Sequence, residues 1–295
     1  MRRSSNTATK LKQLFQVNFG ILEMPFRILH AFIAGENNSI RDARKATLSI
    51  QKCSFREPFP NLIAHFKGIK KIKLQKCQQL NTATAFSAMA KMDALLWLDI
   101  SGCKTVVDQT LSQLKNLQYL DLSNNQVVQS DILSKLTQLT HLNLEGCKIK
   151  SFDFLQHLPK LQYLNLGRNQ LKQIPDTVLG LKKLRVLILK QNKIEFIPAS
   201  IEQSNVRELN LSGNRIEQLH PGIWHMKDLK KLTLRTNKIQ YFDIAKEKVL
   251  SRSKLQELDL SNNQICHFRI GPDQMQQLSV LDLSKNALNQ LDDSI

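Results

Sequence analysis

The chain has 295 residues, of which 42% are hydrophobic and 23% charged, a composition typical of a folded protein rather than a disordered one. Its formal net charge is +17, and the excess is concentrated at the start, where residues 1–76 hold 15 Lys and Arg against 4 Asp and Glu. No stretch approaches the roughly 20 apolar residues of a membrane span, so we expect none.

The apolar run at residues 14–35 does not have the features of a signal peptide. Glu23, Pro25 and Arg27 interrupt it, and no small-residue cleavage site follows. We therefore expect a polypeptide that is cytoplasmic as synthesised, and any secretion into a host cytoplasm would use a route without a classical signal. The five cysteines, an odd number, indicate reduced thiols rather than a disulfide framework.

Residues 1–44 form a segment without the repeats that follow. Three stretches, 9–18, 25–34 and 39–46, predict two helices and a shorter third, with proline at a helix start and glycine after the first two. Their apolar faces would cover the first turn of a repeat array, as terminal repeats require. The segment is therefore predicted to be a helical cap.

Residues 45–295 contain a period of 22–26 residues with the pattern L-x-x-L-x-L-x-x-N-x-L. "LQYLDLSNNQV", "LQYLNLGRNQL" and "LQELDLSNNQI" are near-perfect copies. The turns begin, in chain order, at Lys45, Ile69, Leu95, Leu117, Leu139, Leu161, Leu184, Val206, Leu229, Leu255 and Leu278. In these residues the chain resembles the leucine-rich repeat family, over about eleven repeats.

The resemblance implies an α/β fold, a curved leucine-rich repeat solenoid with a parallel sheet on its concave side. The alternation within each turn is that of a short strand with one buried face. "QIPDTVLGLKKL" and "FIPASIEQSNV" predict short helical connections, and the longer "YFDIAKEKVLSRSKL" predicts a full helix. Little sequence follows the last turn, so its edge predicts either a tail that folds across it or self-association.

Position nine of the turns contains four of the five cysteines, Cys53, Cys77, Cys103 and Cys147, and asparagine elsewhere. Each of these side chains must point inward, where asparagine bonds backbone groups and cysteine does so more weakly. A column of thiols spaced by whole turns does not converge on one point as a zinc site requires. We interpret them as structural thiols and expect no metal.

Position three of the strands faces the concave side and contains rings on four successive turns: Trp97, Tyr119, His141 and Tyr163. Position five of the first two of these turns is Asp99 and Asp121. Aromatic anchors flanked by hydrogen-bonding groups are typical of the centre of an interface. An exposed strand face enriched in β-favouring aromatics is the structural alternative.

Basic residues follow on later turns, and we include them in the predicted binding surface: Arg168, Arg185, Lys190, Arg207, Lys230, Lys231 and Arg235. A second run, at Lys70, Lys71, Lys73 and Lys76, lies on the second turn. Such runs are solvated faces or docking sites for an acidic partner or an anionic surface. Nucleic acid is disfavoured, because bases and aromatics mostly occupy separate turns.

The sequence has no phosphate-binding loop, metalloprotease helix or nucleophile elbow, and none of its cysteines is followed two residues later by aspartate. We expect no enzyme activity and no cofactor. The prediction is a non-enzymatic protein that binds a protein partner on its concave face. The mixture of repeat types resembles the leucine-rich repeat effectors that intracellular bacteria inject, which implies a host protein as partner.

The alternative function begins from "LEMPFRIL" at residues 22–29, which resembles the opening of an F-box. F-boxes often precede leucine-rich repeats in substrate adaptors of cullin ubiquitin ligases. Four residues match the adaptor-docking motif: Met24, Pro25, Ile28 and Leu29. Arg27 stands where an acidic residue is common, and fewer than 25 residues separate the motif from the first repeat strand.

Overall fold

The computed structural model describes residues 47–52, 68–245, 253–271 and 274–289. They belong to two compact units, unit 1 at Met1–Gln126 and unit 2 at Val127–Ile295. The predicted helical cap, the F-box-like motif and Cys53 lie outside the described residues.

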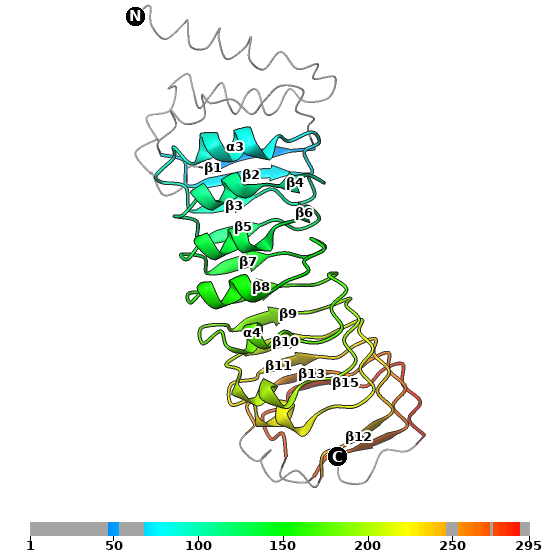
Figure 1. Cartoon of the computed structure of the whole chain (residues 1–295). Helices are drawn as coiled ribbons and strands as arrows, with labels where there is room; N and C mark the ends of the chain where they lie inside the picture. Colours follow the sequence, from blue (N-terminus) through cyan, green and yellow to red (C-terminus); the bar gives the residue numbers. More distant parts are fainter. Residues whose placement is uncertain (1–46, 53–67, 246–252, 272–273, 290–295) are drawn as a thin grey trace, which may run out of the picture. The chain divides into compact units, whose positions relative to one another are not determined.

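Unit 1 contains four parallel strands, β1 (Thr47–Gln51), β2 (Lys71–Gln75), β3 (Trp97–Asp99) and β5 (Tyr119–Asp121), paired in that order (Figure 1). The register places Lys71 opposite Trp97 and Trp97 opposite Tyr119. The other elements in the described part of unit 1 are α3 (Thr82–Met89), β4 (Val106–Val107) and η3, a 3-10 helix at Gln109–Gln113; β6 (Gln126–Val127) spans the boundary between the units.

Unit 2 continues the same construction with seven parallel strands, whose bounds are β7 (His141–Asn143), β8 (Tyr163–Asn165), β9 (Val186–Ile188), β10 (Glu208–Asn210), β11 (Lys231–Thr233), β13 (Glu257–Asp259) and β15 (Val280–Asp282). Short helices connect them: η4 (Ser130–Lys135), η5 (Asp153–His157), α4 (Asp176–Leu179), η6 (Ala199–Gln203) and η7 (Pro221–His225). Figure 1 shows these strands stacked one turn after another.

Every predicted turn has a strand, and nearly all strands begin at position three of the pattern, which confirms the α/β leucine-rich repeat solenoid. The strands are short because only positions three to five alternate before the chain bends. At position four, Ile72, Leu98 and Leu120 are completely buried. No single turn could bury these side chains on both sides, so the stacked turns of each unit form one continuous core.

Position eight of the turns has a backbone conformation that the pattern did not predict. It lies in the left-handed region in every turn, with φ between 54° and 71°, whether the residue is Gly102, Asn124 or Thr236. This conformation bends the chain after the strand and turns position nine inward. It favours glycine, yet most turns here use a larger residue.

Position nine is buried from Cys77 to Asn237 and half-buried at Asn263 and Asn286, with the side chain turned inward as predicted. Asn169 donates from Nδ2 to the carbonyls of Leu144 at 2.8 Å, Leu166 at 3.1 Å and Gly167 at 3.0 Å, and Oδ1 accepts from the N–H of Ile149 at 3.2 Å. The asparagine therefore bonds its own turn and the turn before it. We call this set the position-nine column.

Cysteine takes the place of asparagine in this column and offers a weak S–H donor in place of the side-chain amide. Cys147 is completely buried, and its thiol lies 3.7 Å from the Glu145 carbonyl. The N–H of Val127, at the position that usually donates to an asparagine Oδ1, bonds the Cys147 carbonyl at 3.4 Å instead. The cysteine sulfur thus occupies the place of the asparagine amide, and the backbone N–H bonds a backbone carbonyl instead of a side-chain oxygen. This agrees with the weaker hydrogen-bonding role predicted for cysteine.

The connections are short helices as predicted for the turns that contain α4 and η6. The segment from Tyr241 to Leu255 begins with a strand that was not predicted, and the helix expected within it stays a prediction. Its first residues form β12 (Tyr241–Asp243), which pairs with β14 (His267–Arg269) in a small parallel sheet. The Phe242 ring stacks on Phe268 with centroids 4.8 Å apart. This stacked pair of buried rings explains why the segment begins as a strand; residues 246–252 lie outside the description.

The last described strand, β15, is less buried than the strand beside it, β13. Val280 is 53% exposed, and Leu281 and Leu283 are half-buried, whereas Leu258 on the neighbouring strand is completely buried. The predicted covering tail or self-association at this edge stays a prediction.

Candidate functional site

The open face of each sheet consists of the side chains at positions three and five, which point away from the leucine core. In unit 1 its centre is Trp97, whose ring stacks on Tyr119 with centroids 4.3 Å apart and an interplanar angle of 13°. Both side chains are half-buried. Direct register between β3 and β5 brings the two rings together, because residues opposite each other in parallel strands are about 4.8 Å apart.

Lysines from β2 complete this site on the opposite side of Trp97. The ammonium groups of Lys71 and Lys73 lie 5.5 Å and 5.0 Å from the centroid of the indole ring. Both distances are within the range in which a cation is attracted to the face of an aromatic ring. Strand order places Tyr119 on one face of the indole and the two lysines on the other, so the aromatic and basic groups form one surface.

The two predicted aspartates of unit 1 are buried rather than presented on this surface. Asp99 is 4% exposed and Asp121 is 9% exposed. The Oδ1 atom of Asp99 accepts from the N–H of Ser101 at 2.9 Å, and that of Asp121 accepts from Ser123 at 2.8 Å. Position five thus closes the bend after the strand, and the binding role predicted for these carboxylates stays a prediction.

Unit 2 contains the other half of the predicted ring series. His141 stacks on Tyr163 with centroids 5.8 Å apart and an interplanar angle of 20°. Partial desolvation lowers the pKa of His141 below its ordinary value of 6.5. The four predicted rings are therefore found as two stacked pairs, one in each unit.

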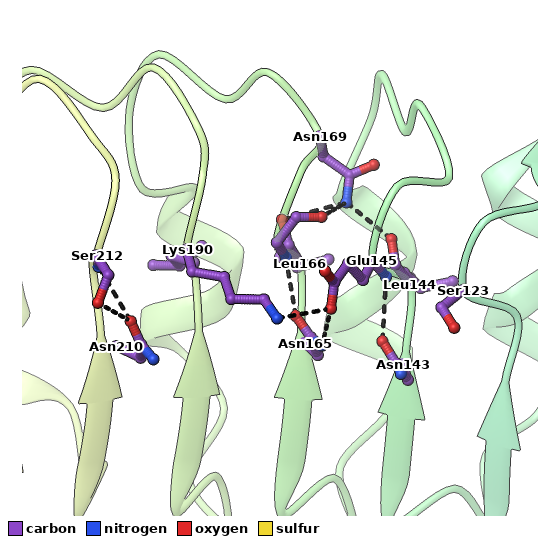
Figure 2. A network of polar contacts seen from close by, with 12 residues as sticks. Ser123, Asn143, Leu144, Glu145, Asn165, Leu166, Asn169, Lys190, Asn210 and Ser212 are labelled. Carbon is purple, nitrogen blue, oxygen red and sulfur yellow. Dashed lines mark hydrogen bonds and ion pairs between the residues drawn. The ribbon is translucent and has the colours of Figure 1, made fainter. Parts of the chain in front are cut away.

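A polar network lies beside this second pair (Figure 2). The Oε2 atom of Glu145 accepts from Nδ2 of Asn165 at 3.1 Å and pairs with Nζ of Lys190 at 3.2 Å. Figure 2 shows the Lys190 side chain running from its own turn across the intervening one to reach Glu145. The intervening turn has Gly167, where an added Cβ would lie 3.1 Å from Lys190 Cγ, so the glycine makes room for the crossing.

Some of the remaining predicted basic residues already form hydrogen bonds or an ion pair within the protein. Arg185 donates from Nη1 to the carbonyls of Leu184 at 3.0 Å and Asn205 at 3.2 Å. Lys231 forms an ion pair with Glu257, whose hydrogen bond raises the pKa of the lysine. The others are exposed and make no ion pair among the described residues: Arg168, Arg207, Lys230 and Arg235.

The thiols of unit 1 have the properties of structural residues. The pKa of Cys103 is raised well above its ordinary value, first by a hydrogen bond with the Cys77 thiol and then by burial. The Cys103 thiol also donates to the Leu74 carbonyl at 2.8 Å. Across the described ranges, no group of three His, Cys, Asp or Glu side chains could hold a metal ion. Within the same ranges, every helix is too short or too polar to cross a membrane.

One hollow in unit 2 was not predicted from the sequence. Its volume is about 380 Å³, and its lining includes Glu217, Trp224, Tyr241 and Asp243. None of the predicted site residues lines it. It opens where the turn with η7 meets the longer turn with β12, and only the irregular length of that turn could have signalled it.

Comparisons with known proteins agree with this architecture. Two family models for leucine-rich repeats match the chain, one at residues 115–157 and 137–183 and the other at residues 204–265. No curated protein matches the sequence.

Three solved structures illustrate the structural similarity. A leucine-rich repeat protein of Leptospira interrogans has 24% identity and a TM-score of 0.67, with 87% of this chain and 71% of that chain covered. A Listeria monocytogenes internalin has 20% identity and a TM-score of 0.56, with 83% and 82% covered. The ectodomain of an Arabidopsis thaliana receptor kinase, in complex with Casparian strip integrity factor 2, has 20% identity and a TM-score of 0.57, with 84% and 37% covered.

Proposed function

The chain is a leucine-rich repeat protein, and on that premise we propose that it is a non-enzymatic protein whose open sheet face binds a protein partner. Leucine-rich repeat domains generally mediate protein–protein interactions. The observation that carries the proposal is the stacked pair of Trp97 and Tyr119, with two lysine ammonium groups over the indole.

This arrangement supports binding because the side chains are held in place before a partner arrives. A stacked indole with cations on its second face has few alternative rotamers, so little conformational entropy is lost on association. Tryptophan and tyrosine are also the residues most enriched where binding energy concentrates. Rings with a purely structural role are expected to be buried, whereas Trp97 and Tyr119 are half-buried on the face opposite the core.

We extend the proposal to a partner from a host cell. The support is the resemblance of the repeat mixture to injected bacterial effectors. The similar Arabidopsis ectodomain, seen in complex with a named factor, is an example of the fold in the same general role. The F-box-like alternative has no described residue in its favour.

Affinity capture with the full chain tests this function. Replacing Trp97 and Tyr163 together by alanine removes one ring from each stacked pair. Phe196→Ala is the matched control, since Phe196 is 54% exposed but lies outside the strands of the open face. We expect the amount of the main partner captured from a eukaryotic lysate to fall at least about tenfold with the double variant. The control should capture as much of it as the wild-type chain.

A bacterial lysate processed in parallel tests the host assignment, and the partner should be absent from it. Circular dichroism must show that both variants keep the wild-type fold. An unchanged set of captured proteins for the double variant would contradict the proposed surface.

A further inference from the structure

The turn that contains β2 has Lys71 and Lys73 on the open face of unit 1 and Lys76 at position eight. Lys71, Lys73 and Lys76 make no ion pair among the described residues. In unit 2, four lysines form ion pairs with carboxylates: Lys190, Lys231, Lys238 and Lys254. Lys71 and Lys73 thus bring two ammonium groups that form no ion pair among the described residues to the indole of Trp97.

The acidic residues near this charge are already engaged. Asp99 is opposite Lys73 in the register, yet its Oδ1 accepts from Ser101 and its Oδ2 accepts from Nε2 of Gln75. Asp121 is buried and accepts from Ser123. Residues 68–126 contain seven lysines, four aspartates and no glutamate. The lysines of this range outnumber the aspartates, and the two strand aspartates are buried, so the exposed charge of this face is mainly positive.

The faces of Trp97 distinguish between two kinds of anionic ligand. Single-stranded nucleic acid binds by stacking its bases on exposed aromatic faces. Here Tyr119 covers one face of the indole and the ammonium groups of Lys71 and Lys73 cover the other. A ligand that brings carboxylates to the ammonium groups and contacts the ring edges fits this arrangement better than a base.

We propose that the open face of unit 1 binds an acidic segment of a protein partner, with carboxylates at Lys71 and Lys73. The proposal rests on the proposed function and specifies the chemistry of its partner. Lys71 and Lys73 are two residues apart on β2, so their backbones are roughly 6.6 Å apart on the same side of the strand. An extended segment with acidic residues at alternate positions has the same spacing, and we infer that this pattern is preferred.

Titration with a synthetic peptide tests the inference. The probe is an extended peptide of about 12 residues that alternates glutamate and serine, and glutamine replaces glutamate in the reference peptide. Calorimetry measures affinity, and tryptophan fluorescence reports the site. Trp224, the second tryptophan, is only 6% exposed and lies in unit 2, so the fluorescence change should vanish in Trp97→Phe.

Two variants with the same change of charge give the decisive comparison. We expect Lys71→Gln with Lys73→Gln to weaken binding of the acidic peptide at least about tenfold. Lys238→Gln with Lys254→Gln, which removes two ion-paired lysines of unit 2, should weaken it less than about twofold. Raising the salt to about 0.5 M should weaken binding by the wild-type chain, since the lysines are accessible to solvent ions.

Three results would overturn the inference. The first is no binding of the acidic peptide, and the second is an equal loss in both variants, which would reflect net charge alone. The third is tighter binding of an oligothymidylate with the same dependence on Lys71 and Lys73, which would assign the face to nucleic acid. If the peptide fails while capture from lysate still depends on Trp97, the proposed function stands and only the acidic partner is wrong.

Discussion

Replacement of Asn192 by alanine tests whether the position-nine column links the turns of unit 2. The Asn192 amide donates from Nδ2 to the carbonyls of Leu166 at 3.0 Å and Leu189 at 2.9 Å. Its Oδ1 accepts from the N–H groups of Asn169 at 2.9 Å and Leu171 at 3.0 Å. Alanine removes these four bonds and a longer fifth one, from Nδ2 to the Lys190 carbonyl at 3.4 Å, at a position that is 7% exposed.

The cost of this change comes mainly from the two N–H donors. The Leu166 carbonyl also accepts from Asn169 Nδ2, and the Leu189 carbonyl accepts from Asn214 Nδ2, so both acceptors keep a partner. The N–H groups of Asn169 and Leu171 lose their acceptor inside the core. Each buried unsatisfied donor costs about 1–3 kcal/mol, so the free energy of unfolding should fall by about 2–6 kcal/mol.

Urea denaturation followed by circular dichroism measures the loss, with two comparison variants. Asn192→Cys should cost less than the alanine variant, because Cys147 shows how the backbone adjusts around a thiol at this position. Gln173→Ala, an exposed position in the preceding turn, should change the free energy of unfolding by less than about 0.5 kcal/mol. A cost for Asn192→Ala no greater than that of Gln173→Ala would refute the reasoning.

Further predictions concern a bend, the thiols and a titration. Gly213→Ala should lower the free energy of unfolding by about 1–2 kcal/mol in the same assay, because φ is +67° there and the new Cβ would lie 3.2 Å from Gln191 Cγ. Labelling of the native chain with iodoacetamide at about pH 8, read by mass spectrometry, should modify exposed Cys266 and leave Cys103 unmodified, since burial and a raised pKa keep its thiol protonated. His141 should titrate below pH 6.5 by NMR; because the unfolded chain binds this proton more readily, its contribution to stability is present at pH 7 and is lost as pH falls through the folded pKa.

The sequence predicted the fold almost completely because each repeat marks its strand and its bend at the same positions, so successive turns align. Position three marks a strand in every turn, and position nine marks the inward side chain. The left-handed backbone at position eight was not predicted, since glycine, asparagine, lysine and threonine all occur there. The helix expected within residues 241–255 stays a prediction, because residues 246–252 lie outside the described residues; the strand before it, with Phe242 aligned on Phe268, was not predicted.

The candidate site was predictable as a set of positions but not as a set of contacts. Alternation correctly placed Trp97 and Tyr119 on one face, and the register stacks them. It also placed Asp99 on that face, although a short carboxylate there reaches the N–H two residues on and becomes buried. The cations over Trp97 depend on the rotamers of Lys71 and Lys73, on which spacing in a sequence carries no information.

The reach of the position-nine column has a consequence for how such a chain can change length. Asn214 bonds the Leu189 carbonyl and the Ile194 N–H, which both belong to the turn immediately before it. Leu166 and Leu171 present the same two groups one turn earlier. After deletion of residues 184–205, Asn214 would therefore meet the Leu166 carbonyl and the Leu171 N–H in place of the Leu189 carbonyl and the Ile194 N–H. Deletion of half a turn would not provide such equivalent groups. Duplication and loss of whole turns is then a route by which a gene can lengthen or shorten the protein while its polar interior stays intact.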